Sequence, residues 1–217
     1  MRDVEVYNEN RNVLDLTEYI IKGNLRLKYL TLENYVITKI CSKKIELHMN
    51  TFRNVIFENH YEGNYIVIKK CTFVNCSFHD AFGNDSHLEM KDCVFHDCLF
   101  ENVSMDIKGE ISTILNLQFV NCTFKNMNIK GSLEISYLDV NEGVMEHIDC
   151  LGNDISSSQF SNLTLKNLNL NLALFHNKFE SVIFQSVTLK GCMRLECENE
   201  NEFLQCDTRG FKFIEGS

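Results

Sequence analysis

The sequence predicts an all-β solenoid, a chain that coils and turns a corner every five residues. Three observations indicate this fold class. A five-residue pattern runs through most of the 217 residues, short polar residues recur at its last position, and the chain has no proline, where about ten would be usual. Because proline has no backbone N–H to donate, its absence indicates that nearly every N–H is needed for pairing.

The five-residue pattern is clearest in residues 71–80, 93–102 and 117–126. An apolar residue, most often phenylalanine, marks the centre of each unit, and a small or apolar residue stands two positions earlier, as Cys71 does before Phe73. Extended in both directions with a few breaks, the pattern gives 28 centres, and none of them is charged. The centres expected to form the structural stack are Phe52, Phe57, Phe73, Phe78, Phe95, Phe100, Phe119 and Phe124.

Each unit is predicted to be a short strand followed by a corner. The centre and the position two before it face the same way, because one residue between them is the alternation of a β-strand. Two polar residues then break the alternation, and the second is often Asn or Asp, which tolerate left-handed backbone and hydrogen-bond to their own main chain. The predicted corner residues are Asn54, Asn59, Asn75, Asp80, Asp92, Asp97, Asn102, Asn121, Asn126, Asn162 and Asn167.

These units resemble the pentapeptide-repeat family, whose motif centres on Leu or Phe with a small residue two positions before and often Asp or Asn nearby. The resemblance covers about residues 25–191, and it departs from the motif where the small position holds a larger residue such as Leu25 or Tyr35. It implies a right-handed quadrilateral β-helix with four units per coil and the centres stacked inside. Twenty-eight units then give about seven coils.

The repeat divides the chain into three parts. Residues 1–24 are expected to form an N-terminal cap and residues 25–191 the β-helix. Residues 192–217 are expected to form a C-terminal cap or a homodimer contact, as in family members that pair through this end. Caps are needed because open β-edges pair with other chains.

Irregular segments interrupt the pattern near 60–65, 82–87, 107–113 and 131–142, and one residue is lost after the centre Phe175. Insertions that recur about once per coil emerge from the same side of the rod, which we call the looped side. Two interpretations stay open. Repeat proteins often bind partners on the face that carries their insertions, and loop tips are also where insertions are simply tolerated.

The ten cysteines do not indicate a metal site or a disulfide framework. No pair has the C-x2-C spacing of common zinc sites. Five cysteines occupy the small inward position, where a thiol packs as a compact apolar group, and the repeat places Cys76, Cys98 and Cys122 on one side. The His-Asp pairs at 79–80 and 96–97 fall on neighbouring sides, with no nucleophile spaced to join them. The sequence therefore predicts no cofactor, no metal and no enzyme.

Charge and hydropathy limit the classes of partner and the expected location of the protein. A net charge of −9 disfavours direct binding of nucleic acid. No apolar run approaches the roughly 18 residues of a membrane span, and the chain starts without an apolar signal segment, so we expect a cytoplasmic protein. Acidic residues outnumber basic ones between 80 and 110. We call this group the acidic belt and predict that it binds a partner; it comprises Asp80, Asp85, Glu89, Asp92, Asp97, Glu101, Asp106 and Glu110.

The expected function is that of a non-enzymatic interaction module, a rigid rod that docks an unidentified protein through its looped side or its acidic belt. The resemblance implies an alternative, because some pentapeptide-repeat proteins mimic duplex DNA and bind the type II topoisomerases DNA gyrase and topoisomerase IV, protecting them from quinolones. A third interpretation, a secreted bacterial effector, has no export feature to support it. A continuous acidic strip along the rod would favour DNA mimicry, whereas an isolated belt would favour a protein partner.

Overall fold

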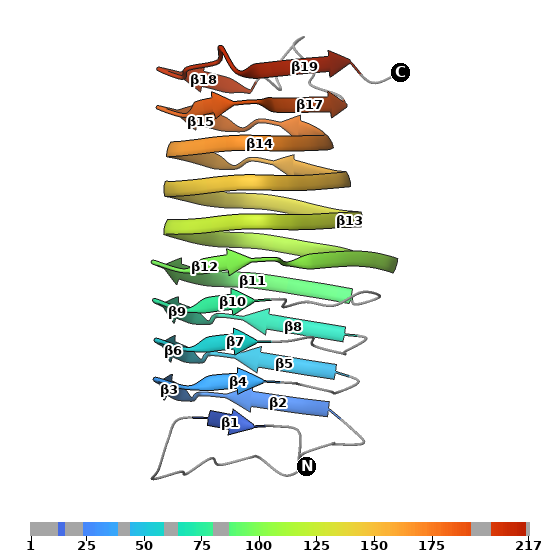
Figure 1. The fold of residues 1–217 in the computed structure, drawn as a ribbon. Coiled ribbons are helices and arrows are strands. Elements are labelled where there is room, and N and C mark those ends of the chain that lie inside the picture. Colours follow the sequence, from blue (N-terminus) through green and yellow to red (C-terminus); the bar gives the residue numbers. More distant parts are fainter. Residues whose placement is uncertain are drawn as a thin grey trace.

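The computed structural model describes residues 13–15, 24–38, 44–58, 65–79, 87–191 and 201–215. In this part of the chain all regular elements are β-strands (Figure 1), so no helix is present there that could cross a membrane. The pairings between these strands are parallel, and the chain winds as a β-solenoid of about seven turns. The all-β solenoid predicted from the sequence is therefore confirmed.

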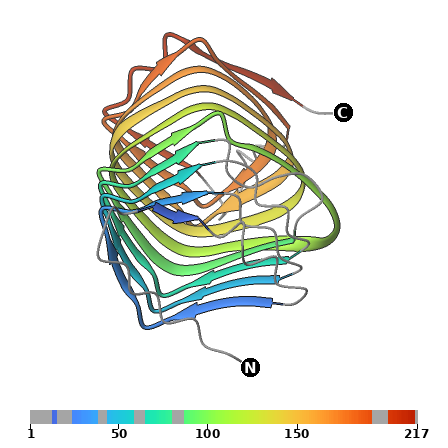
Figure 2. The ribbon, with the colours of Figure 1, turned by 60° about the horizontal axis from the view of Figure 1, so that its bottom comes forward.

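Stacked strands form four sides around a common axis (Figure 2). Side 1 contains β2 (Asn24–Lys28), β5 (Lys44–His48), β8 (Tyr65–Lys69) and the first part of β11 (His87–His96). Side 2 contains β3 (Thr31–Glu33), β6 (Thr51–Arg53), β9 (Thr72–Val74) and the rest of β11. Side 3 contains β1 (Val13–Asp15), β4 (Val36–Thr38), β7 (Ile56–Glu58), β10 (Ser77–His79) and β12 (Leu99–Glu101).

The later strands continue the same four sides. Two long strands, β13 (Ser104–Ser156) and β14 (Gln159–Phe175), run around the coil and supply side 4 as well. They are followed by β15 (Lys178–Glu180) on side 2, β16 (Ile183–Gln185) on side 3 and β17 (Val187–Gly191) on side 4. The last pair is β18 (Glu202–Leu204) on side 2 and β19 (Phe211–Glu215) on side 4.

The corners between sides have left-handed backbone, as predicted. Nine of the eleven predicted corner residues have φ between +52° and +56°, and the other two, Asn59 and Asp80, lie outside the described residues. Side-chain amides bridge corners on successive turns. Asn54 donates to Asn34 at 2.9 Å, and Asn75 donates to Asn54 at 2.8 Å. A short polar side chain at the corner thus stabilises both its own backbone and the turn beside it.

Stacked phenylalanine rings fill the core of the N-terminal half. On side 2, Phe52, Phe73, Phe95 and Phe119 form one column, with neighbouring centroids 4.9, 4.6 and 4.7 Å apart. On side 3, Phe57, Phe78, Phe100 and Phe124 form a second column, with spacings of 4.7, 4.6 and 4.9 Å. The two columns meet edge to face, an arrangement that aromatic quadrupoles favour.

Where the inward position two before a centre holds Asn, Ser or Cys, its side chain satisfies backbone groups near the corners. Asn50 is buried there, and its amide donates to the Leu27 carbonyl at 2.9 Å and accepts from the Leu30 N–H at 3.0 Å. Cysteine at this position satisfies the carbonyl only. The thiols of Cys76, Cys98 and Cys122 donate to carbonyls of the preceding turn at 3.5 to 3.6 Å.

Two details of the predicted repeat are wrong. Residues 107–113 and 131–142 are not loops, because β13 runs through both, and within the second segment Ile135 and Val140 are buried centres that the sequence pattern missed. Phe175 is not a centre. Leu174 takes the inward place, because a register shift after Leu151 drops one residue earlier than expected. The other irregular segments, 60–65 and 82–87, lie almost wholly outside the described residues.

Strands also continue into both predicted caps. In the N-terminal segment, β1 pairs with β4. In the C-terminal segment, β18 and β19 add to the stack, and Phe203 stacks on Phe179 with centroids 4.9 Å apart. Phe203, Phe211 and Phe213 are only partly buried. The cap boundaries, and a homodimer contact at the C-terminal end, stay predictions.

Candidate protein-binding face

The acidic belt wraps around the rod. Glu89 lies on side 1, Asp92 at the corner to side 2, Asp97 at the corner to side 3, and Glu101 on side 3. Asp80 and Asp85 lie outside the described residues, and nothing is described of the side chains of Asp106 and Glu110. The described acids therefore do not gather on one face.

Each described acid of the belt contacts a neighbour on an adjacent turn. Glu89 pairs with Lys69 at 2.5 Å. The carboxylates of Asp92 and Asp97 each accept a hydrogen bond of 2.7 Å, from Asn116 and Asn121 respectively. Asp92 and Asp97 also have φ of +54°, so they are structural corners. A partner-binding role for the belt stays a prediction.

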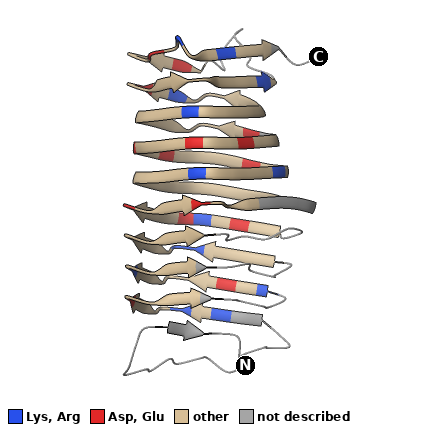
Figure 3. Ribbon diagram, in the orientation of Figure 1, with Lys and Arg blue, Asp and Glu red and all other residues tan. Residues whose placement is uncertain are grey.

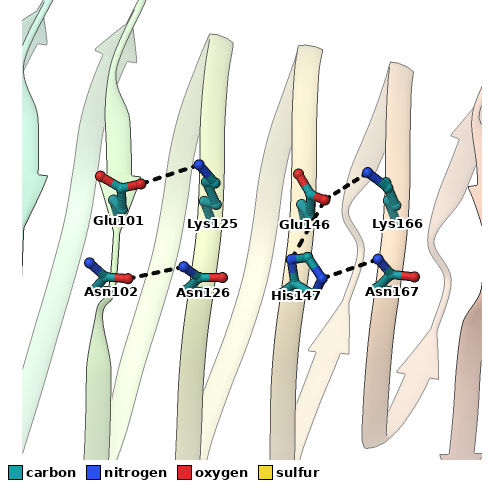
Figure 4. Close-up of polar contacts among 8 residues, drawn as sticks. All are labelled: Glu101, Asn102, Lys125, Asn126, Glu146, His147, Lys166 and Asn167. Atoms are coloured by element: carbon teal, nitrogen blue, oxygen red, sulfur yellow. Dashed lines mark hydrogen bonds and ion pairs between the residues drawn. The ribbon is translucent and has the colours of Figure 1, made fainter.

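A column of alternating charge runs along side 3. It occupies the outward position just after each centre and comprises His79, Glu101, Lys125, Glu146 and Lys166. The Glu101 carboxylate lies 3.4 Å from His79 Nδ1. It also lies 3.4 Å from Lys125 Nζ, and Lys166 Nζ lies 2.7 Å from the Glu146 carboxylate (Figure 4). We call these five residues the charge ladder.

Side-chain amides at the next corner support the charge ladder. Asn126 donates to Asn102 at 3.1 Å, and Asn167 contacts His147 Nε2 at 3.2 Å (Figure 4). His147 Nδ1 also lies 3.6 Å from the Glu146 carboxylate. Two parallel columns of polar contacts therefore hold this edge of side 3 in register.

Neighbouring cations lower the pKa of one ladder residue, Glu146. The hydrogen-bonded ammonium of Lys166 lowers the pKa of Glu146 below its usual value, and the positive charge of Lys125 on the other side acts in the same direction. The Glu146 carboxylate therefore lies between two cations. Alternation of this kind places opposite charges directly across neighbouring strands, which stabilises a sheet where like charges would weaken it.

A column of apolar and hydroxyl side chains, which we call the apolar column, lies beside the charge ladder. It occupies the outward position just before each centre on side 3, where Leu99 and Val144 are half-buried and Ile183 is 42% exposed. The full column is Val36, Ile56, Ser77, Leu99, Thr123, Val144, Thr164 and Ile183. We call the two columns together the side-3 face.

Side 1 is mixed in charge as well. Lys28, His48, Lys69 and Lys91 follow one another in register, and Glu46 and Glu89 stand in the column beside them. Figure 3 shows basic and acidic residues interspersed along the visible strands of the rod. Among the described residues, therefore, no continuous acidic strip runs along the axis.

The cysteines at the small inward positions are buried, and none of the described cysteines is in a disulfide. The neighbouring thiols of Cys122 and Cys76, together with burial, raise the pKa of the Cys98 thiol well above its usual range. Such a thiol stays protonated and is a poor nucleophile. In the described part of the chain no three His, Cys, Asp or Glu residues group as metal ligands.

The charge ladder is not among the residues predicted from the sequence, although its signal is present there. The five residues recur at intervals of 20 to 24 residues, one turn apart. Those intervals vary with the insertions, so the column emerges only when the length of each turn is known.

The chain was compared with known protein families, curated proteins and solved structures. No family model matches the chain, and no curated protein matches it. Among solved structures, QnrB1, a plasmid-mediated fluoroquinolone resistance protein, is 18% identical over 88% of this chain and 91% of its own, with a TM-score of 0.32. HetL, a pentapeptide repeat protein involved in heterocyst differentiation regulation in the cyanobacterium Nostoc sp. strain PCC 7120, is 8% identical over 94% and 95%, with a TM-score of 0.31.

Fold and surface together define a class of protein, a four-sided parallel β-solenoid with an ordered outer face. Five-residue sides, inward centres and left-handed corners are the architecture that the resemblance to the pentapeptide-repeat family implies.

Proposed function

We propose that this chain is a non-enzymatic binding rod that docks a protein partner on the side-3 face. The observation that supports the proposal is the charge ladder, in which cations and carboxylates alternate in register beside an apolar column. Because the charges alternate regularly, the side-3 face has an ordered charge pattern but little net charge. Such a pattern selects a partner by complementary charge order, and complementarity of this kind contributes specificity more than raw affinity.

The size of the face fits a transient complex. Five residues at about 3.3 Å make a side roughly 16 Å wide, and seven turns at about 4.8 Å make it roughly 34 Å long. The resulting area of about 550 Å² per partner is at the low end for specific interfaces. Apolar contacts around Leu99 and Val144 would supply the buried centre, and the ladder would supply the polar rim.

The alternative, a mimic of duplex DNA that acts on a type II topoisomerase, is less well supported. Duplex DNA presents one negative charge per about 1.7 Å of axis. On side 3, by contrast, Lys125 separates the carboxylates of Glu101 and Glu146. A surface built this way does not reproduce an uninterrupted column of phosphates.

Site-specific crosslinking tests the proposal. A photoreactive amino acid is placed at Leu99 on the side-3 face or, as a matched control, at Thr72 on side 2, and the crosslinked proteins from native cells are identified. We expect a protein captured from position 99 and not from position 72. Its purified form should then bind the purified rod.

Charge substitutions provide the second stage. Glu101→Lys should weaken binding of that purified protein about tenfold or more. The double exchange Glu101→Lys/Lys125→Glu restores an ion pair between positions 101 and 125 in reversed order, but it places a carboxylate at 125 beside Glu146. It should therefore recover only part of the stability of the rod and should not restore binding. Equal binding by all three forms would contradict the role of the side-3 face.

A supercoiling assay with DNA gyrase, with and without a fluoroquinolone, addresses the alternative. We expect no inhibition and no protection across a wide range of rod concentrations. Protection at micromolar or lower concentration would overturn the present proposal in favour of DNA mimicry.

A further inference from the structure

The turn between Phe119 and Phe160 lacks an aromatic ring in its core, as does the first described turn, whose centres include Leu27 and Leu32. The former has the centres Ile135, Val140, Met145 and Cys150, and we call it the Val140 turn. The described turns before it, from Phe52 onward, and those after it, to Phe203, each contribute at least one phenylalanine ring to the core. The column of rings on side 2 is therefore interrupted at this turn.

The interruption lies where a phenylalanine ring would continue the side-2 column. Gln118 donates to Asp139, which places Phe119 directly beside Val140, and Val140 pairs in register with Phe160. Phe119 and Phe160 thus face the gap from either side. Elsewhere in the column, Phe73 fills the same slot between Phe52 and Phe95, with centroids 4.9 and 4.6 Å away.

An apolar cavity runs along the axis of the rod and passes the Val140 turn. Its volume is about 200 Å³, and its apolar lining extends from Leu88 to Phe211 and includes Phe119, Val140, Met145 and Phe160. A second apolar cavity, lined by residues from Leu27 to Phe78 and including four phenylalanines, has a volume of about 20 Å³. Apolar cavities of about 150 Å³ in proteins stay free of water and accept benzene or xenon.

We propose that this axial cavity binds a small apolar molecule, and that a flat six-membered aromatic ring lying between Phe119 and Phe160 is the best-fitting ligand. The ring would restore the stacking that Val140 interrupts and regain dispersion contacts that the cavity wall lacks. Polar analogues are excluded, because the cavity offers no hydrogen-bond partner to a buried polar group.

Thermal unfolding of the full chain with and without benzene tests the proposal. Benzene should raise the midpoint by about 3 °C at ten times its dissociation constant, and phenol should do so far less. Val140→Phe should fill the slot, raise the midpoint without ligand and abolish the benzene response. Val144→Phe, a change of the same size on the outer surface, should leave that response intact.

A second measurement tests the proposal even if the Val140→Phe variant fails to fold. Broadening of the fluorobenzene ¹⁹F signal should occur with the wild-type chain and should be reduced by Val140→Leu or Met145→Phe. No benzene response in the wild-type chain would overturn the proposal. An equal response in a folded Val140→Phe variant would overturn it too, because the ligand would then bind elsewhere.

Discussion

The rings of Phe73 and Phe95 lie face to face, with centroids 4.6 Å apart and planes within 2° of each other, although 22 residues separate them in the chain. This contact shows how the solenoid is built. One turn of the coil returns the backbone to the same side, one strand spacing along the axis, so that like residues stack on like.

The stacked core predicts a large cost for removing a central ring. Phe100 stacks on Phe78 and Phe124 at 4.6 and 4.9 Å. Phe100→Ala should lower the free energy of unfolding by about 3–5 kcal/mol, because the rigid turns around it leave a cavity. Chemical denaturation measures this loss. Leu99→Ala, one residue away on the outer surface, should cost far less, and an equal cost would contradict the stacked core.

The inward amide of Asn50 predicts a graded series. Asn50→Ala leaves the Leu27 carbonyl and the Leu30 N–H without their partner, which should cost about 2–4 kcal/mol of unfolding free energy. Asn50→Cys should cost less, because a thiol at this position can donate to the same carbonyl, as Cys76 does on the next side. If the two variants unfolded alike, the hydrogen bonds of Asn50 would not be what stabilises the corner.

The corner backbone predicts a stabilising substitution. Tyr137 has φ of +56° and is 60% exposed, a conformation that costs an ordinary L-residue roughly 1–2 kcal/mol. Tyr137→Asn should raise the thermal midpoint, with a gain of about 0.5–1 kcal/mol, because asparagine tolerates this backbone. Tyr137→Ala removes the ring but keeps the Cβ, and it should bring no gain. A gain from alanine as large as from asparagine would refute the backbone explanation.

Acid sensitivity is predicted at Glu46 on side 1. The Arg26 guanidinium hydrogen-bonds to this carboxylate and, with Lys44 at 2.7 Å, lowers its pKa from 4.5 to about 2. A lowered pKa in the folded state contributes stability that is complete above pH 4.5 and is lost as the pH falls toward 2. Unfolding free energies measured between pH 6 and pH 2.5 should show this loss.

The matched variants for that measurement are Glu46→Gln and Glu134→Gln, the latter on an exposed residue in the same outward column. Glu46→Gln should flatten the acid side of the stability profile, whereas Glu134→Gln should leave it nearly unchanged. Identical profiles for the two variants would show that the ion pairs of Glu46 do not contribute.

Much of the fold follows from local chemistry that the sequence displays. Phe95 and Asp97 illustrate this, because an inward apolar centre and a left-handed corner are each encoded by one residue and repeat every five positions. The prediction failed at Val140 and Phe175. There the repeat drifts by one residue or carries atypical centres, and only strand pairing with the adjacent turn fixes which side chain faces inward.

The candidate site was far less accessible from sequence. Acidic residues that are close in sequence, such as Glu89 and Glu101, lie on different sides, whereas Glu101 and Lys125 are neighbours across one turn. The sequence by itself determined the side chain that each five-residue unit turns inward and the backbone of its corner, because both depend on residues next to one another. Only the tertiary structure decided which charges face each other and where the core is left unfilled, because both depend on the exact length of every turn.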